Sequence, residues 1–110
     1  MSLYADYLKE RTTDHILETP SGFASYRYVN EGKTVYIVDI YVVPEERKSG
    51  RASALADEII KEAKLKGCSE VLGSVQPSTK NSTDSLKVLL AYGFELFNAG
   101  QDFIFLKKKI

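Results

Sequence analysis

Residues 34–67 decide the fold of this chain. They read TVYIVDIYVVP over residues 34–44, EERKSGRAS over residues 45–53 and ALADEIIKEAKLKG over residues 54–67. The first part is almost entirely β-branched or aromatic and ends at a proline, which is typical of a strand buried on both faces. The third part carries apolar residues at helical spacing between charges, which predicts an amphipathic helix with Gly67 as its left-handed cap.

The loop between this strand and helix carries three cations and one glycine, in the order Arg47-Lys48-Ser49-Gly50-Arg51. A glycine at a helix start lets the backbone approach a ligand closely, because it has no side chain. The first N–H groups of a helix have no partner inside the helix and suit an anion. This stretch is therefore predicted to be a strand, a phosphate-binding turn and a helix.

Composition limits the classes of function. The chain has 110 residues, which suits a single domain over residues 1–110. Its 15 basic and 15 acidic side chains balance, which argues against broad nucleic-acid binding. The single cysteine, Cys68, excludes an internal disulfide and a cysteine-based metal cluster, and no metal is expected. We see no signal peptide and no membrane-spanning run, so we expect a cytoplasmic protein that binds no membrane.

The pattern along the chain predicts the order α, β, β, β, α, β, α, β, β. Antiparallel hairpins flank a β-α-β unit, which indicates an α/β (α+β) fold with a mixed, mostly antiparallel sheet and helices packed on it. A second helix would begin at Ser82 or Thr83 and end at Tyr92, with three leucines inward, namely Leu86, Leu89 and Leu90. The other expected elements are a helix over residues 3–11 and strands over residues 15–19, 23–29, 34–43, 70–75, 94–97 and 102–106.

Residues 22–106 resemble the GNAT N-acetyltransferases. The run Arg47-Lys48-Ser49-Gly50-Arg51-Ala52 fits the family signature R/Q-x-x-G-x-G/A, and DIYVVPE over residues 39–45 precedes it like the family's fourth strand. The segment Ser82-x-x-Ser85-x-x-x-Leu89-x-x-x-Gly93-Phe94 is similar to the family's N-x-x-A/S-x-x-x-Y-x-x-x-G-F. The chain is short for this family and looks similar to acetyltransferase-like proteins of bacteriophages.

The resemblance implies acetyl-CoA as co-substrate. In the family the pyrophosphate lies on backbone N–H groups of the signature loop, while the pantetheine arm pairs with the fourth strand. The N–H of Val42 would then face the thioester carbonyl. The side chains of Arg47, Lys48 and Arg51 would add attraction, or would only form a solvated cationic turn. The implied cofactor-binding residues are Ile40, Tyr41, Val42, Val43, Arg47, Lys48, Ser49, Gly50, Arg51, Ala52, Ser53, Asn81, Ser82 and Ser85.

The catalytic residues are less evident, because the family's tyrosine is replaced by Leu89. Tyr92 would be a substitute acid for the thiolate, or simply a core aromatic. Asp39 and Tyr36 are the remaining residues for the amine proton, and strand alternation predicts that they lie on opposite faces. Asp39 would alternatively satisfy neighbouring backbone. Asp39 and Tyr92 are therefore the catalytic hypotheses.

The expected reaction is acetyl transfer to a primary amine of an unknown acceptor, small molecule or protein. The alternative is a catalytically weak CoA-binding module with a regulatory or interaction role. About 20 residues precede Phe23, and the family's acceptor-covering helices need more. The acceptor side would therefore be open to a macromolecule or closed by a second subunit, and we expect a homodimer.

Overall fold

The computed structural model describes residues 3, 6–7, 14–47, 50–78 and 82–110, with the side chains of residues 82–85 excepted. Leu3, Asp6 and Tyr7 are helical, and the rest of the expected first helix lies outside the described residues. The strands are β1 (His15–Thr19), β2 (Gly22–Val29), β3 (Thr34–Val42), β4 (Glu70–Val75), β5 (Glu95–Ala99) and β6 (Ile104–Lys109). The helices are the short 3₁₀ turn η1 (Pro44–Glu46), α2 (Arg51–Leu65) and α3 (Ser82–Tyr92).

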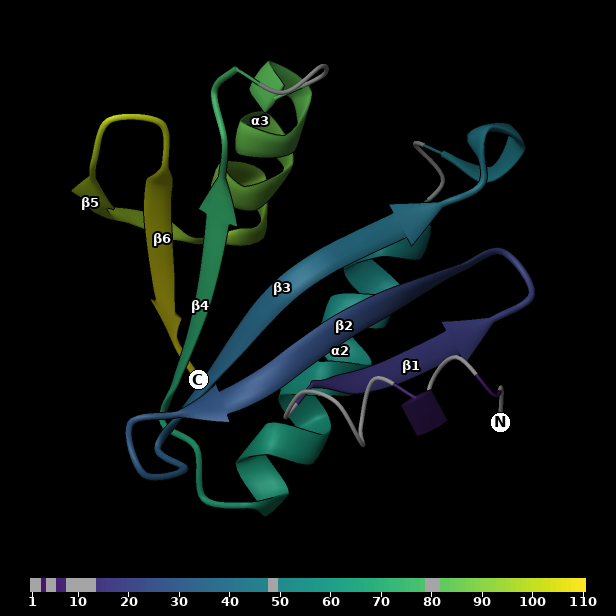
Figure 1. The fold of residues 1–110 in the computed structure, drawn as a ribbon, viewed down its shortest axis with the longest axis horizontal. Helices are drawn as coiled ribbons and strands as arrows, with labels where there is room; N and C mark the ends of the chain where they lie inside the picture. Colours follow the sequence, from purple (N-terminus) through teal and green to yellow (C-terminus); the bar gives the residue numbers. More distant parts are fainter. Residues whose placement is uncertain (1–2, 4–5, 8–13, 48–49, 79–81) are drawn as a thin grey trace.

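The six strands form one mixed sheet in the order β1-β2-β3-β4-β6-β5 (Figure 1). Only β3 and β4 run parallel, since α2 connects them as a crossover, and the other neighbours are antiparallel. The predicted fold class is thus confirmed. The predicted strands over residues 15–19 and 70–75 have the observed bounds.

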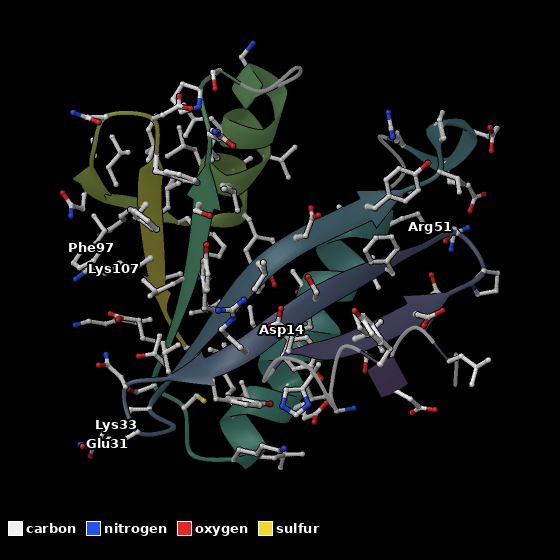
Figure 2. All side chains as sticks on the ribbon, viewed as in Figure 1. Asp14, Glu31, Lys33, Arg51, Phe97 and Lys107 are labelled. Atoms are coloured by element: carbon white, nitrogen blue, oxygen red, sulfur yellow. The ribbon has the colours of Figure 1, made fainter. Side chains whose placement is uncertain are left out.

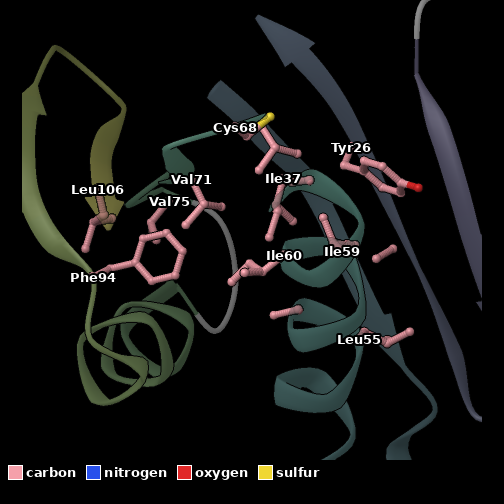
Figure 3. Packing of buried hydrophobic residues seen from close by; sticks show 14 of the residues in the cluster. Tyr26, Ile37, Leu55, Ile59, Ile60, Cys68, Val71, Val75, Phe94 and Leu106 are labelled. Carbon is pink, nitrogen blue, oxygen red and sulfur yellow. The ribbon is translucent and has the colours of Figure 1, made fainter. Parts of the chain in front are cut away.

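The core lies between the sheet and its two helices, on what we call the helix face. α2 packs on β2 and β3, and α3 on β4. A Cβ on Gly73 of β4 would contact the side chains of Leu89 and Phe94, which places the α3 region on the same face. Figure 3 shows these buried side chains as a continuous layer, in which Ile59 of α2 and Val71 of β4 are almost fully buried. Such burial is the main favourable term in folding.

Three details differ from the expectations. β3 is not buried on both faces, because Asp39 and Tyr41 are exposed. Leu90 is 46% exposed, whereas Leu86 and Leu89 do pack on the core. The last strand is shifted to residues 104–109, because its backbone pairs along the whole of β4, from Val75↔Ile104 to Glu70↔Lys109.

Candidate functional site

β3 and β4 pair only over their first three residues. Thr34 pairs with Glu70, and Tyr36 with Leu72 is the last pair. β3 then continues to Val42 and β4 to Val75 without pairing to each other, and Figure 1 shows the two strands diverging. We call the unpaired parts, residues 37–42 and 73–75, the β3–β4 split. Backbone groups on this side of β3 are therefore not used by β4.

The direction of the β3 backbone follows from the residue after the strand. The N–H of Val43 donates to the carbonyl of Ser21 at 2.8 Å, which is on the β2 side. Because successive residues of a strand direct their N–H and C=O groups to alternate sides, Val42 and Ile40 direct theirs into the split. Of the predicted pantetheine-pairing residues, Ile40 and Val42 thus face the split, whereas Tyr41 and Val43 face β2.

The predicted turn before α2 is present, and its glycine has a left-handed backbone. Gly50 is the residue before the helix, with φ 84° and ψ 6° in the left-handed region that favours glycine. A Cβ at Gly50 would meet no atom within 4 Å, so the space beside it is open among the described residues. Its carbonyl accepts the N–H of Ala54, which leaves the N–H groups of residues 51–53 without an intrahelical partner. Lys48 and Ser49 lie outside the described residues.

The two described arginines of this loop have partners within the protein. Arg51 lies at the start of α2, near the end of β3 (Figure 2), and its Nε is 3.3 Å from the Glu46 carboxylate. The Nε of Arg47 donates to the Val42 carbonyl at 2.8 Å. The Arg47 guanidinium also lies over the Tyr41 ring, 5.5 Å from its centroid. The Arg47 side chain therefore extends back to the end of β3. The other two described residues of the predicted loop, Ala52 and Ser53, belong to the first turn of α2.

A β-bulge corrects the expected placement of Tyr36 and Asp39. Asp39 pairs with Ser25, but Tyr36 pairs with Arg27, so β3 has one extra residue, Val38, between the two pairs. Ser25 and Arg27 are two residues apart on β2 and share a face. Tyr36 and Asp39 therefore lie on the same face, opposite the helix face, and the prediction of opposite faces was wrong. We call this side the opposite face.

The opposite face carries paired polar side chains from β2, β3 and β4. The hydroxyls of Tyr36 and Ser74 are 2.7 Å apart and hydrogen bonded. Arg27 is paired with the buried Asp14, with Nε 2.6 Å from Oδ1 and Nη2 donating to Oδ2 at 3.1 Å. Figure 2 shows Asp14 in front of the sheet. Sequence reasoning missed Ser74, although its place two residues after Leu72 in an alternating strand was a usable signal.

Tyr92 lies on the helix side of the sheet. Its hydroxyl donates to Asp57 of α2, and its ring packs on Phe94 with centroids 5.9 Å apart. Burial raises the pKa of Tyr92, and the bond to Asp57 raises it further, so the phenol stays protonated. The structure thus does not bring Tyr92 together with Asp39, and a catalytic role for either residue stays a prediction.

Two of the three remaining predicted residues belong to α3. Asn81 lies outside the described residues, and Ser82 and Ser85 are in α3 without a described side chain.

Neither helix formed by the described residues is long and apolar enough to cross a membrane.

The fold and this site define the class of protein as a mixed α/β domain with two parallel strands that separate in front of a glycine turn and a helix. The model of the acetyltransferase (GNAT) family matches residues 5–94. This chain therefore belongs to the GNAT acetyltransferase family.

Three solved structures have the same fold. A GNAT acetyltransferase from Desulfovibrio desulfuricans is 19% identical with a TM-score of 0.78, and the match covers 94% of this chain and 75% of that one. A GNAT acetyltransferase from Elizabethkingia anophelis with acetyl-CoA bound is 17% identical with a TM-score of 0.75, covering 98% and 82%. PaiA N-acetyltransferase from Thermoplasma acidophilum in complex with coenzyme A is 19% identical with a TM-score of 0.72, covering 82%. The present chain spans 54% of the length of that enzyme.

Proposed function

We propose that this protein is an acetyl-CoA-dependent N-acetyltransferase that transfers acetyl to a primary amine. The observation that carries the proposal is the β3–β4 split ending beside the left-handed Gly50 turn of α2. Membership of the family supports it, as do related folds solved with acetyl-CoA or coenzyme A.

Two backbone segments suit the two parts of the co-substrate. The N–H groups of residues 51–53 and the positive end of the α2 dipole would hold the pyrophosphate beside Gly50, where a Cβ would meet no atom of the described residues within 4 Å. The N–H and C=O groups of Ile40 would pair with the pantetheine amides as an added strand does, whereas the Val42 carbonyl already accepts the Arg47 Nε–H. The sites of both parts lie at the same end of the sheet (Figure 1).

The reaction joins the amine nitrogen to the thioester carbon and breaks the carbon–sulfur bond. The electron pair of that bond leaves with sulfur, the nitrogen loses one proton, and the thiolate ends protonated as the free thiol. We assign to the Val42 N–H, which is directed into the split, the stabilisation of the oxyanion formed on the way. Asp39, which is exposed on the opposite face, is our candidate for receiving the amine proton.

Thermal unfolding with and without ligand tests the binding step. Acetyl-CoA at about 100 times its dissociation constant stabilises a protein that binds it by about 2.7 kcal/mol. We expect this gain in the wild type and its loss in Gly50→Glu. Gly32→Glu is the matched control, because Gly32 also has a positive φ of 82° and open space around it, but lies in the β2–β3 hairpin. A melting temperature that ignores saturating acetyl-CoA and coenzyme A would refute the proposal.

The transfer step needs an acceptor. A panel of primary amines with acetyl-CoA, followed by free thiol release, tests whether the bound thioester is used. We expect release that depends on both the amine and the protein.

A further inference from the structure

Asp102, in the loop between β5 and β6, binds the segment that leaves β4. Its Oδ2 accepts hydrogen bonds from the Ser78 hydroxyl at 2.7 Å and from the Gln76 side-chain amide at 2.8 Å. Its Oδ1 accepts the backbone N–H of Ser78 at 3.3 Å. The side-chain bond from Ser78 lowers the pKa of Asp102 most, and the bond from Gln76 lowers it next. The acceptor is therefore an ionised carboxylate, whose hydrogen bonds are stronger than those of a neutral group.

These bonds begin where the backbone ladder of β4 ends. Val75 is the last residue of β4, and its pair with Ile104 is the last pair at this end of the β4–β6 ladder. Gln76 and Ser78 lie just beyond that pair, and Asp102 lies just before Ile104. Figure 1 shows the end of β4 and the β5–β6 loop at the same end of the sheet. Asp102 thus continues the connection between these two parts of the chain past the last backbone pair.

The segment bound by Asp102 borders the β3–β4 split. Residues 73–75 form the β4 side of the split, and among the described residues their backbones pair only with β6. The β3 side is paired with β2 as far as Val42. Backbone pairing therefore fixes the β3 side to its end, whereas beyond Val75 the β4 side is connected to the β5–β6 loop through Asp102. α3, which carries the predicted cofactor-binding residues Ser82 and Ser85, begins after the same segment.

Resting on the proposed acetyl transfer, we propose that Asp102 is a positioning residue for the co-substrate, which fixes the β4 side of the split along the pantetheine arm. Asp102 acts through Gln76 and Ser78. The phosphates have their proposed site at the turn before α2, which follows β3 and η1 on the other side of the split. Loss of the Asp102 bonds should therefore weaken binding of the pantetheine part, because the ligand must then order this side itself. Binding of the phosphate part should be retained.

Calorimetric titration of Asp102→Ala with two ligands tests the proposal. The ligands are acetyl-CoA and adenosine 3′-phosphate 5′-diphosphate, which has the phosphates of the co-substrate without the pantetheine arm. We expect the Kd of acetyl-CoA to rise at least about fivefold and that of the nucleotide to change by less than about twofold. Asp102→Asn should stay close to the wild type, since the Ser78 hydroxyl and the Gln76 amide can accept hydrogen bonds as well as donate them. Glu58→Ala, which removes an exposed carboxylate from α2 instead, should leave both Kd values unchanged.

Ser78→Ala removes the shortest of the three bonds and keeps the charge of Asp102. It should raise the Kd of acetyl-CoA in the same direction by a smaller factor, and it takes the place of Asp102→Ala if unliganded melting shows that this variant does not fold. An unchanged Kd of acetyl-CoA in both variants, or an equal loss for the two ligands, overturns the inference alone. A wild type that binds neither ligand overturns the proposed function and this inference with it.

Discussion

The hydroxyl of Tyr36 on β3 lies 2.7 Å from the hydroxyl of Ser74 on β4. Tyr36 belongs to the last backbone pair of the two strands, and Ser74 is two residues beyond its partner Leu72. The side-chain bond thus connects the strands just after their backbone ladder ends. It fixes the place where the β3–β4 split begins.

Ser74→Ala should lower the free energy of unfolding by about 1 kcal/mol, because it removes one partly buried hydrogen bond. Tyr36→Phe should have a similar effect. The free energy of unfolding of the double variant should be no lower than that of the less stable single variant, since each single change already removes the same hydrogen bond. Urea unfolding measures all three, and strictly additive losses would show that the two hydroxyls do not depend on each other.

Tyr92→Phe should lower turnover by less than about tenfold, whereas loss of a true general acid costs at least about 10²-fold. The reason is that the Tyr92 hydroxyl already donates to Asp57 and is kept protonated there, so it is poorly placed to give up its proton. Steady-state kinetics at saturating acetyl-CoA measures the effect. A hundredfold loss with unchanged acetyl-CoA affinity would make Tyr92 the acid.

Asp39→Asn should lower turnover by at least about 10²-fold, if its carboxylate takes the amine proton. The amide has the same shape, and Asp39 is exposed with no ion pair among the described residues, so the melting temperature should stay within a few degrees of the wild type. The loss should shrink as the pH rises, because more of the amine is then neutral without help. A smaller loss than in Tyr92→Phe would remove Asp39 from the reaction.

Gly22→Ala should destabilise the protein by about 1–3 kcal/mol, as overpacking of a tight site does. A Cβ on Gly22 would lie 2.0 Å from the carbonyl oxygen of Tyr41, so the β2 and β3 backbones must move apart. Gly100→Ala is the control, because a Cβ at Gly100 would meet no atom within 4 Å among the described residues beyond its chain neighbours. Urea unfolding of the two variants makes the comparison, and equal stability would contradict the clash.

Tyr28 should make stability depend on alkaline pH. Burial raises the pKa of Tyr28 to about 12, with the charges of Glu62 and Cys68 adding to it. The unfolded tyrosine loses its proton near 10, so stability is fully present below about pH 10 and falls as the pH rises toward 12. Part of this dependence should remain in Tyr28→Phe, because burial also raises the pKa of Tyr26.

Tyr28→Phe should itself be neutral or stabilising at pH 7. The Tyr28 hydroxyl is buried and has no hydrogen-bond partner among the described residues, and removing such a group avoids its desolvation cost. Urea unfolding at pH 7 and pH 10.5 measures both effects. A clear loss of stability at pH 7 would reveal a partner for the hydroxyl.

Local patterns were sufficient for most elements. The strand of residues 70–75 and the amphipathic helix that became α2 were predicted because period-2 and period-3.6 patterns of apolar residues leave one arrangement that buries them. Gly50 was predicted to lie in a turn at a helix start for a different reason, because a residue without a side chain lets a ligand approach the backbone closely. The signature around it indicated the family that the family model then confirmed.

Tertiary structure decided those features that depend on contacts between residues distant in the sequence. The bulge at Val38 arises from the pairing of β3 with β2, and no local pattern on β3 shows it, so the shared face of Tyr36 and Asp39 was mispredicted. Lys107, Lys108 and Lys109 extend β6 because β4 offers them backbone partners, in spite of their low strand propensity. Arg47 was expected to act through its charge alone, but its side chain is directed by the Val42 carbonyl and the Tyr41 ring. Sequence sets which groups are present, and the pairing of distant strands sets where they point, because each register choice moves a side chain from one face of the sheet to the other.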